Sequence, residues 1–459
     1  MAGSDVESSC PRLLLVANRL PITWAPTSGW GRAPGGLVTS LESVARRKQV
    51  TWFGSSASLG DGRGVAPTWP HGTIHQVRVE ADLAARAVAG FSNSCLWPAL
   101  HAIGNQVRWR EGWWDAYRAF NARFAREVAR TALLGDLVWV HDHHLLLVPE
   151  MLTVERPDLV VGLSLRTPVD ATVLAGLPMT EALTEALTAP AVIGVQTQRD
   201  LAELAAFCPN RLGSVVVSPA SIDPIELLEL ARSRATRALV ERLRGSLGSR
   251  LLVVGVDRID HTKALLQRID AIDRAFRQGH LRPDDVEIIQ IAQPSRTEQA
   301  AYRELRVEVE RRAHDVSSRW VRSDGTPALR VITEGRDRRS VAALLSAADI
   351  ALVTPARDGM NLVAKEFSIY NEQRGGVLVL GEGAGAADEL GDASVLVDGS
   401  DSASIANGIA RAVSLDESTR RIMARRRADA VRSWTSQHWA SDFERRLLDT
   451  RVSDRHPIG

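Results

Sequence analysis

The size, composition and charge of the chain exclude several classes of protein. Its 459 residues are 45% hydrophobic and 24% charged, which is ordinary globular composition and enough for two or three domains. A formal net charge of +1 excludes a field over the whole molecule that would recruit nucleic acid or a membrane. An anionic ligand must therefore be held by a few placed Arg or Lys side chains.

Cysteine usage and the first residues indicate a reducing cytoplasm. The three cysteines, Cys10, Cys95 and Cys208, form no CxxC motif and have no histidines at a spacing typical of zinc. This pattern argues against a disulfide scaffold. The opening MAGSDVESSC lacks the apolar core of a signal peptide, and no apolar run is long enough to span a bilayer. We expect a cytoplasmic protein.

Short apolar runs alternate with longer helical patterns along the chain. Several of the runs are apolar at every position, as in parallel strands buried on both faces. The alternation predicts an α/β fold with doubly wound parallel sheets. The expected strands are 13–17, 50–53, 137–141, 159–165, 192–196, 214–218, 251–256, 286–291, 329–332, 350–353, 376–380 and 394–397, and the expected helices are 111–131, 224–247, 263–277, 296–316, 337–348 and 402–413.

The alternation begins afresh near Gly248, after one long charged helix, which indicates two domains. We expect a polar tail at 1–11, an N-terminal Rossmann-like domain at 12–235, a C-terminal one at 236–435, and a final helix and tail at 436–459 that crosses back to the first domain. Ligands of open α/β sheets lie beyond the carboxyl ends of the strands. If two such sheets face each other, the residues that follow their strands converge on one cleft.

Two groups follow strands of the first half. Arg19 comes directly after 13–17, and Gly35-Gly36 open an apolar helix whose backbone N–H groups suit a phosphate. The alternative is a plain turn with a surface arginine. Asp142 stands beside His141 and His143-His144, where it suits proton transfer or a metal. Because consecutive histidines point to different sides, at most two serve one metal, and a buried, hydrogen-bonded His144 is the alternative.

Cations follow two strands of the second half. Arg258 and Lys263 lie between a strand and a helix start, where a guanidinium fork and a point charge suit a diphosphate. The alternative is a solvated charged face. Arg296 follows the next strand and could meet a second anion.

The segment VTPARDGMNLVAKE, residues 353–366, combines hydrogen-bond donors and acceptors at one strand end. Asp358 can accept from sugar hydroxyls, the amides from Gly359 to Val363 can meet phosphate and hydroxyl oxygens, and Glu366 can hold a ribose. The alternative is a helix cap with ordinary polar turn residues. Donors and acceptors together favour a nucleotide sugar over a bare phosphate.

Over residues 12 to 450 or so, the chain resembles the retaining GT-B glycosyltransferases of the trehalose-6-phosphate synthase type. The likeness lies in LLLVANRLPITW with GGL, FSNSCLWPALH, VWVHDHHLL, VGVDRIDHTK, IAQPSR, and VTPARDGMNLVAKE with GVLVLGEGAGAADEL. It implies two Rossmann-like domains that face a central cleft. It also implies an enzyme that moves glucose from a nucleotide donor to glucose 6-phosphate, without metal or cofactor.

The resemblance implies a role for each candidate residue. Arg258, Lys263 and Asp142 would be catalytic. The donor, a UDP-, ADP- or GDP-hexose, would be bound by Gly36, Arg166, Arg258, Lys263, Asp358, Gly359, Met360, Asn361, Leu362, Val363 and Glu366. The sugar phosphate acceptor would be bound by Arg19, Trp97, Asp142 and Arg296. No nucleic acid or membrane partner is implied, and assembly into a homo-oligomer stays open.

The chain departs from the family pattern in its sugar and base pockets. Arg166 stands where the family has His, so that it either pairs with Asp170 or changes the donor or acceptor, for instance to one that carries an anionic group. Further departures are Val88 for Tyr, His143 for Tyr, Ala264 for Gly, Arg336 for an aromatic residue near the base, and a shortened hairpin between Asn210 and Val215.

Three functions therefore stay open. The first is the trehalose-6-phosphate synthase reaction itself. The second is a sibling transfer to another sugar or polyol phosphate, or a pseudo-glycosidic coupling in secondary metabolism. The third is a catalytically weak regulator that binds sugar phosphate, which the joint retention of Arg258, Lys263, Asp358 and Glu366 argues against.

Overall fold

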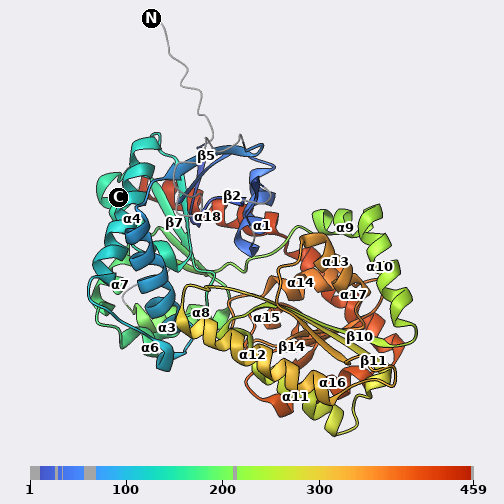
Figure 1. Ribbon diagram of the computed structural model, residues 1–459. Helices are drawn as coiled ribbons and strands as arrows, with labels where there is room; N and C mark the ends of the chain where they lie inside the picture. The colour runs from blue at the N-terminus through green and yellow to red at the C-terminus, as the bar shows by residue number, and fades with distance from the viewer. Residues whose placement is uncertain (1–10, 26–28, 34, 56–68, 210–213, 456–459) are drawn as a thin grey trace, which may run out of the picture. The chain divides into compact units, whose positions relative to one another are not determined.

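The computed structural model describes residues 11–25, 29–33, 35–55, 69–209 and 214–455, and they form two compact units. The first unit contains the chain up to Ser218 and again from Ala440, and the second is Pro219–Trp439. Each unit is built around its own parallel sheet (Figure 1). The expected α/β class with two doubly wound, Rossmann-like units is confirmed. The expected polar tail lies mostly outside the described residues, as does the shortened hairpin before Val215.

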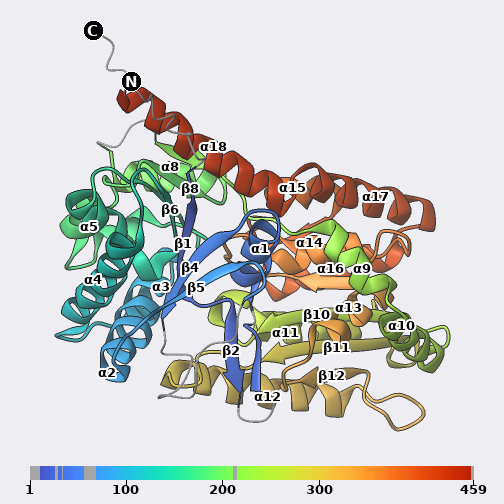
Figure 2. The same ribbon diagram turned by 90° about the horizontal axis from the view of Figure 1, so that it is seen from above.

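The sheet of the first unit has the strand order β5-β4-β1-β6-β7-β8-β9, with every pair parallel. The order runs outward in opposite directions from β1 and β6, so the sheet has a topological switch point between these two strands. The neighbouring β1, β4 and β5 can be followed in Figure 2. The bounds are β1 Leu13–Arg19, β4 Val50–Ser55, β5 Gly72–Val77, β6 Leu137–His141, β7 Val160–Ser164, β8 Val192–Val195 and β9 Val215–Val217.

Helices bury apolar side chains on both faces of this sheet. On one face, the valines of β6 join a core with the helices from α2 to α8. On the other, Trp139 of β6 stacks on Phe443 of the last helix, with ring centroids 4.6 Å apart. The helices are α1 Gly36–Ala45, α2 Ala81–Ala84, α3 Trp97–Leu100, α4 Trp113–Thr131, α5 Val148–Glu155, α6 Ala171–Ala175, α7 Thr180–Ala186, α8 Gln198–Phe207 and α18 Ser436–Arg455, with short 3₁₀ turns η3 Gly104–Gln106 and η4 His143–Leu145.

The sequence prediction missed several elements of the first unit, among them a hairpin, an edge strand and a π-helix. β2 Ile22–Ala25 and β3 Gly29–Arg32 form an antiparallel hairpin. The strand β5 lies at the sheet edge, and its polar sequence GTIHQV lacks the apolar run of a buried strand. The π-helix η2, Ala85–Leu96, is long for its type, and the Ser92 and Ser94 hydroxyls donate to carbonyls five residues back.

The sheet of the second unit repeats the first in the order β12-β11-β10-β13-β14-β15, again wholly parallel. Its switch point lies between β10 and β13. One apolar cluster lies on the face covered by α11, α12 and α16, and another on the face covered by α9, α13, α14 and α17. The bounds are β10 Leu251–Arg258, β11 Val286–Gln293, β12 Leu329–Ile332, β13 Ile350–Val353, β14 Val377–Gly381 and β15 Val395–Val397.

Two expected helices of the second unit differ in the structure. The single helix at 224–247 is wrong, because Ser233 has extended backbone and its hydroxyl accepts from Thr236 N, so α9 ends and α10 begins there. The helix at 296–316 begins only at Ala300, because Arg296 has a left-handed backbone with φ 48°. The helices are α9 Pro224–Arg232, α10 Arg234–Leu247, α11 Leu265–Arg277, α12 Ala300–Arg319, α13 Arg338–Ala347, α14 Leu362–Tyr370, α15 Ala387–Leu390, α16 Ser402–Ser414 and α17 Glu417–Ser433, with 3₁₀ turns η5 His261–Lys263, η6 Pro283–Asp285 and η7 Gly391–Ala393.

The chain changes units at two places. It enters the second unit at Pro219, ahead of the boundary between 235 and 236 that the sequence suggested, because α9 and α10 pack on α13 of the second unit. It returns to the first unit within α18, between Trp439 and Ala440. Within the described residues, no helix is long and apolar enough to cross a membrane.

Candidate functional site

The expected site residues flank the switch point of each sheet. In the first unit, Arg19 ends β1 and Asp142 follows β6. In the second unit, Arg258 ends β10 and Asp358 follows β13 after a short loop. Because ligands of doubly wound sheets bind at the carboxyl ends of the strands on either side of this point, each unit has its own candidate ligand-binding edge.

Asp142 is held in an unusual backbone conformation, with φ 72°. Its N–H donates to Ser164 O at 2.8 Å, and its Oδ1 accepts from Arg166 N at 3.3 Å and lies 3.2 Å from His143 Nδ1. Burial raises the pKa of Asp142, but the neighbouring His143 outweighs burial and brings the pKa below its ordinary value. The group is therefore a carboxylate that can accept from a sugar hydroxyl.

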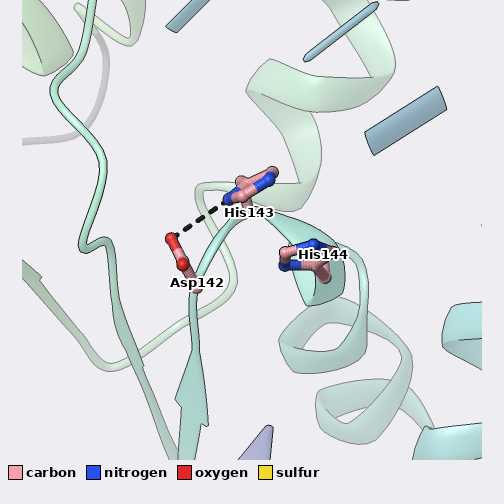
Figure 3. A group of neighbouring side chains, drawn as sticks. All are labelled: Asp142, His143 and His144. Carbon is pink, nitrogen blue, oxygen red and sulfur yellow. Dashed lines mark ion pairs between the residues drawn. The ribbon is translucent and has the colours of Figure 1, made fainter. Parts of the chain in front are cut away.

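Asp142, His143 and His144 are also a group, among the described residues, with the donor atoms for a metal. Their ligand atoms lie within 4.8 Å of one another. Figure 3 shows His143 directed at Asp142 and His144 beside it, with the two imidazole centroids 4.0 Å apart. A hydrogen bond holds this turn in place, since Tyr117 OH donates to His143 O at 2.7 Å. That the reaction needs no metal stays a prediction.

Arg166 lies beside Asp142. Its Nη2 is 3.5 Å from Ser40 Oγ on α1. Burial lowers the pKa of Arg166 to about 10, and the charge of Asp142 counteracts this shift. The other expected partner, Asp170, caps α6 by accepting from Val173 N at 2.9 Å. Arg166 therefore adds a positive charge next to the carboxylate of Asp142.

His141, the last residue of β6, is fully buried beneath this pair. Burial lowers the pKa of His141 well below its ordinary value, and the positive charge of Arg166 lowers it further. Its imidazole is therefore neutral under ordinary conditions.

The other candidates of the first unit lie on separate elements. Arg19 is exposed, and its backbone carbonyl accepts from Trp52 Nε1 at 2.9 Å. Gly36 is the first residue of α1, whose N-cap Gly35 offers no side chain to the first-turn N–H groups. Trp97 is buried and stacks on His101, with centroids 4.0 Å apart. Val88, which replaces the expected tyrosine, packs against the core of the first unit and brings no hydroxyl.

In the second unit, the structure joins Lys263 to Asp358 by an ion pair. Lys263 closes η5, whose first residues are held by Asp260 accepting from Thr262 N at 3.2 Å. The Asp358 carboxylate also accepts from Gly359 N at 3.0 Å. The two side chains that the sequence assigned to phosphate and sugar thus lie against each other.

The loop that carries Asp358 is fastened to the loop after β14. Asp358 N donates to Gly383 O at 2.8 Å, and Ala386 N donates to Met360 O at 2.8 Å. Gly383 passes so close to the carbonyl of Ala356 that a Cβ there would collide with it. The GEGAGA sequence after β14 therefore has no side chain at the point where these two loops cross.

Arg258 and Arg296 reach the same edge of the sheet. Arg258 is mostly exposed; its Nη1 donates to Ser295 Oγ at 3.3 Å, and its Nη2 lies 3.6 Å from Asp260 Oδ2. Arg296 donates to Tyr302 OH and has its guanidinium 5.2 Å from the centre of that ring. Burial raises the pKa of Tyr302, so that its neutral phenol accepts from Arg296.

The start of α14 presents polar groups that can bind a ligand. Asn361, its N-cap, has a left-handed backbone with φ 69° and makes no side-chain cap. Both polar atoms of its buried amide lack a hydrogen-bond partner among the described residues. The next amides, of Leu362 and Val363, lie in the first turn of the helix, where N–H groups favour anions.

One turn later, Glu366 is partly buried, and its charge adds to the burial that raises the pKa of Tyr370. Arg336, at the expected position of an aromatic residue, is exposed in the loop after β12. Sequence reasoning passed over Ser40, Ser295 and the buried Arg268. Ser40 lies inside α1, Ser295 lies in the loop before α12, and Arg268 has the spacing of an ordinary charged helix position, so no sequence signal marked them.

The comparisons with known proteins agree on one family. The model of glycosyltransferase family 20 matches residues 11–449. The trehalose-6-phosphate synthase of Mycolicibacterium gilvum is 35% identical over 492 residues, which cover 100% of this chain and 96% of that protein. The Mycobacterium tuberculosis enzyme of the same name is 34% identical, with coverage of 97% and 95%.

Solved structures agree with these relatives. The UDP-forming alpha,alpha-trehalose-phosphate synthase from Burkholderia xenovorans, in complex with glucose-6-phosphate, superimposes with a TM-score of 0.87 at 30% identity, covering 95% of this chain and 100% of that chain. An E. coli structure with UDP-2-fluoro glucose bound gives 0.86 at 26% identity, with coverage of 95% and 98%. These likenesses confirm the expected GT-B fold class, and the chain belongs to glycosyltransferase family 20.

Proposed function

We propose that the chain transfers a hexosyl group, glucose in the first instance, from a nucleoside diphosphate sugar to a sugar phosphate such as glucose 6-phosphate, with retention of configuration. The observation that carries the proposal is the second unit's switch point. Two cations, a carboxylate and the buried amide of Asn361 gather there at the start of a helix. Relatives solved with glucose-6-phosphate and with a UDP-glucose analogue support both substrate classes.

On the donor side, Arg258 and Lys263 hold the diphosphate. Because Lys263 is paired with Asp358, an arriving diphosphate competes for the ammonium and releases the carboxylate for sugar hydroxyls. Met360 and the amides from Gly359 to Val363 line this turn, and Asn361 gains hydrogen-bond partners from the sugar. Glu366 accepts from the ribose. Gly36 and Arg166 of the first unit complete the donor set.

On the acceptor side, Arg19 and Arg296 bind the phosphate, and Trp97 and Asp142 line the sugar. The acceptor hydroxyl attacks the anomeric carbon from the face that the nucleoside diphosphate leaves. The new C–O bond forms as the C–O bond to phosphate breaks, and the departing phosphate takes the proton of the hydroxyl. Arg258 and Lys263 stabilise the charge that develops on the leaving group, so this scheme uses neither a metal nor a cofactor.

A related transfer with a different donor or acceptor is the second candidate. The observation that favours it is Arg166, whose cationic side chain lies beside Asp142 and adds a site for an anionic substituent. A catalytically weak regulator that binds sugar phosphate is the third candidate. A regulator of this kind has no need of the donor-site pair of Lys263 and Asp358.

A transfer screen by mass spectrometry tests the proposal. UDP-, ADP- and GDP-hexoses are crossed with hexose phosphates, glycerol phosphate and buffer, with Lys263→Met as the matched inactive protein. A product with the mass of trehalose 6-phosphate, absent with Lys263→Met, supports the proposal. A product only from another pair supports the second candidate, and nucleotide binding without any product overturns both in favour of the regulator.

A further inference from the structure

Arg268 of α11 is an arginine that the proposed chemistry does not use and that water does not reach. Its exposed fraction is 1%. It forms an ion pair with Asp257, donates to Gln290 Oε1 at 2.9 Å and to Thr354 Oγ1 at 3.0 Å, and reaches the Lys263 carbonyl at 3.3 Å. A buried guanidinium with such partners is a fixed junction, since breaking any one bond strands a buried polar group.

These partners come from different strands at one edge of the second sheet. Asp257 lies near the end of β10, Gln290 lies in β11, and Thr354 follows β13 directly. These strands are neighbours in the order β11-β10-β13, so Arg268 spans the switch point from beneath. Gly255 of β10 leaves the space, because a Cβ there would collide with the Gln290 amide and lie 3.1 Å from Arg268 Nη1.

Three of the four partners also begin or belong to a segment that carries a proposed donor contact. Asp257 directly precedes Arg258, Thr354 precedes Asp358 by one short loop, and the Lys263 carbonyl belongs to Lys263 itself. The two loops are further joined, since Ala356 N donates to Thr262 O at 3.0 Å. The buried side chain of Arg268 thus connects the backbone segments that carry Arg258, Lys263 and Asp358.

We propose that Arg268 is a positioning residue for the donor diphosphate site: it sets the separation of Arg258, Lys263 and Asp358 without touching the donor. The proposal rests on the proposed function and adds a residue to that site. Its physical basis is that charges held in place before the reaction stabilise a developing charge without reorganisation, and that a misplacement of about 1 Å can cost about 10²-fold in rate.

The primary test compares Arg268→Lys with Arg322→Lys. Arg322 is also a buried arginine of the second unit, paired with Glu287 and bonded to Val286 O at 3.0 Å, but it lies at the opposite, amino end of β11. Lysine keeps the positive charge at each position but lacks the several N–H donors of the planar guanidinium. We expect Arg268→Lys to lower kcat/KM for the donor by roughly 10–10²-fold, with the acceptor KM unchanged. Arg322→Lys should lower Tm only.

Two less disruptive substitutions at Thr354 test the proposal if Arg268→Lys does not fold. Thr354→Val removes only the acceptor for Arg268 Nε at nearly constant volume, and Thr354→Ser restores the hydroxyl. We expect Thr354→Val to raise donor KM and Thr354→Ser to return most of the loss. Equal donor kinetics in Thr354→Val and the wild type, or an equal loss in Arg322→Lys, overturns the proposal.

Calorimetric titration with UDP, ADP and GDP separates this proposal from the proposed function. If the wild-type chain binds one of these nucleotides but transfers no sugar, the transfer proposal fails alone. Weakened nucleotide binding in Arg268→Lys, relative to Arg322→Lys, then still supports the positioning role. Equal binding by both variants overturns it.

Discussion

Lys263 and Asp358 form an ion pair in the second unit, so the charge of the proposed donor site would depend on whether a ligand is bound there. A diphosphate exchanges one carboxylate partner of Lys263 for a more strongly charged one, and Arg258, already mostly exposed, adds a guanidinium fork. The chemistry assigned to this edge therefore depends on two side chains.

Removing either cation should reduce transfer by at least about 10²-fold, the scale of losing one group that stabilises a developing charge. We expect this for Arg258→Gln and Lys263→Met, measured as kcat in the transfer assay. Arg277→Gln is the control, because Arg277 forms an exposed pair with Asp273 on the same helix, α11. Full activity in either site variant would mean that the diphosphate is bound elsewhere.

Arg166→His should change substrate preference. The replacement removes a permanent charge beside Asp142 and shortens the side chain. We expect the ratio of kcat/KM values between neutral and anionic sugar substrates to shift toward the neutral ones in the crossed screen. An unchanged substrate profile would assign Arg166 a structural role.

The free energy of unfolding should fall as the pH drops below about 6.5, in part because of His141. Its folded pKa lies well below the unfolded value, so under these conditions the unfolded chain binds a proton that the folded chain does not. The contribution is present above pH 6.5 and is lost at up to about 1.4 kcal/mol per pH unit as the pH falls toward the folded pKa. In denaturant titrations between pH 7.5 and 5.5, His141→Gln and His141→Leu should both show a shallower slope than the wild type. Equal slopes would contradict the buried neutral imidazole.

At the scale of elements, the loops that follow β13 and β14 act as one piece. Gly383→Ala places a methyl group against the Ala356 carbonyl and pushes the two loops apart, which moves Asp358. We expect roughly 10–10²-fold slower transfer. The matched control is Gly245→Ala, since a Cβ at Gly245 meets nothing within 4 Å and the glycine lies inside α10. This control should raise the free energy of unfolding by about 0.5–1 kcal/mol and leave transfer unchanged. Normal activity in Gly383→Ala would mean that the close contact between the two loops is not needed for transfer.

The buried strands could be predicted from the sequence, and the elements without an apolar signature could not. β6 and β13 have the expected bounds because each lies inside a parallel sheet and is apolar over nearly its whole length. β12 has the expected bounds although it is an edge strand that includes Arg330. The edge strand β5 is largely polar, β3 is glycine-rich and β2 has only four residues, so none of them shows the apolar run of a buried strand. The break at Ser233 was missed because the helical periodicity continues across it, and only the backbone shows that the serine caps a second helix.

The candidate site could be predicted as a set of chemical groups but not as a set of contacts. The positions of Arg19, Asp142, Arg258 and Asp358 follow from their places after strands. The pairing of Lys263 with Asp358 joins positions 95 residues apart, and Arg268 meets Thr354 across 86 residues, so neither has a local sequence signal. The sequence suggested Asp170 as a partner of Arg166 because it is near in the chain, and the structure adds the charge of Asp142, a position 24 residues away.

At the scale of the whole molecule, the first unit is assembled from two distant pieces of chain. Phe443 of α18 stacks on Trp139 and fills the space above Gly162 and Gly194, where added Cβ atoms would lie 2.8 Å and 3.0 Å from its ring. Phe443→Ala leaves a cavity on this face of the sheet.

We expect Phe443→Ala to lower the free energy of unfolding of the first unit by about 3–5 kcal/mol. Hydrogen exchange, read separately for peptides of β6 to β8 and of β10 to β13, would show faster opening in the first group only. Equal acceleration in both groups would mean that α18 stabilises the second unit as well.

Because the first unit is built from two distant pieces of chain, it cannot finish folding until the end of synthesis. On the ribosome, the strands β1 to β9 emerge first, yet the helix that covers one of their faces is made only after the whole second unit. At about 5–20 residues per second, the 221 residues from Pro219 to Trp439 take roughly 10–45 s to synthesise. During that interval the glycine-lined face beside Trp139 lacks α18, the helix whose Phe443 packs against it. The first unit is therefore synthesised first but completed last. Premature termination anywhere before α18 leaves that apolar face for chaperones to bind.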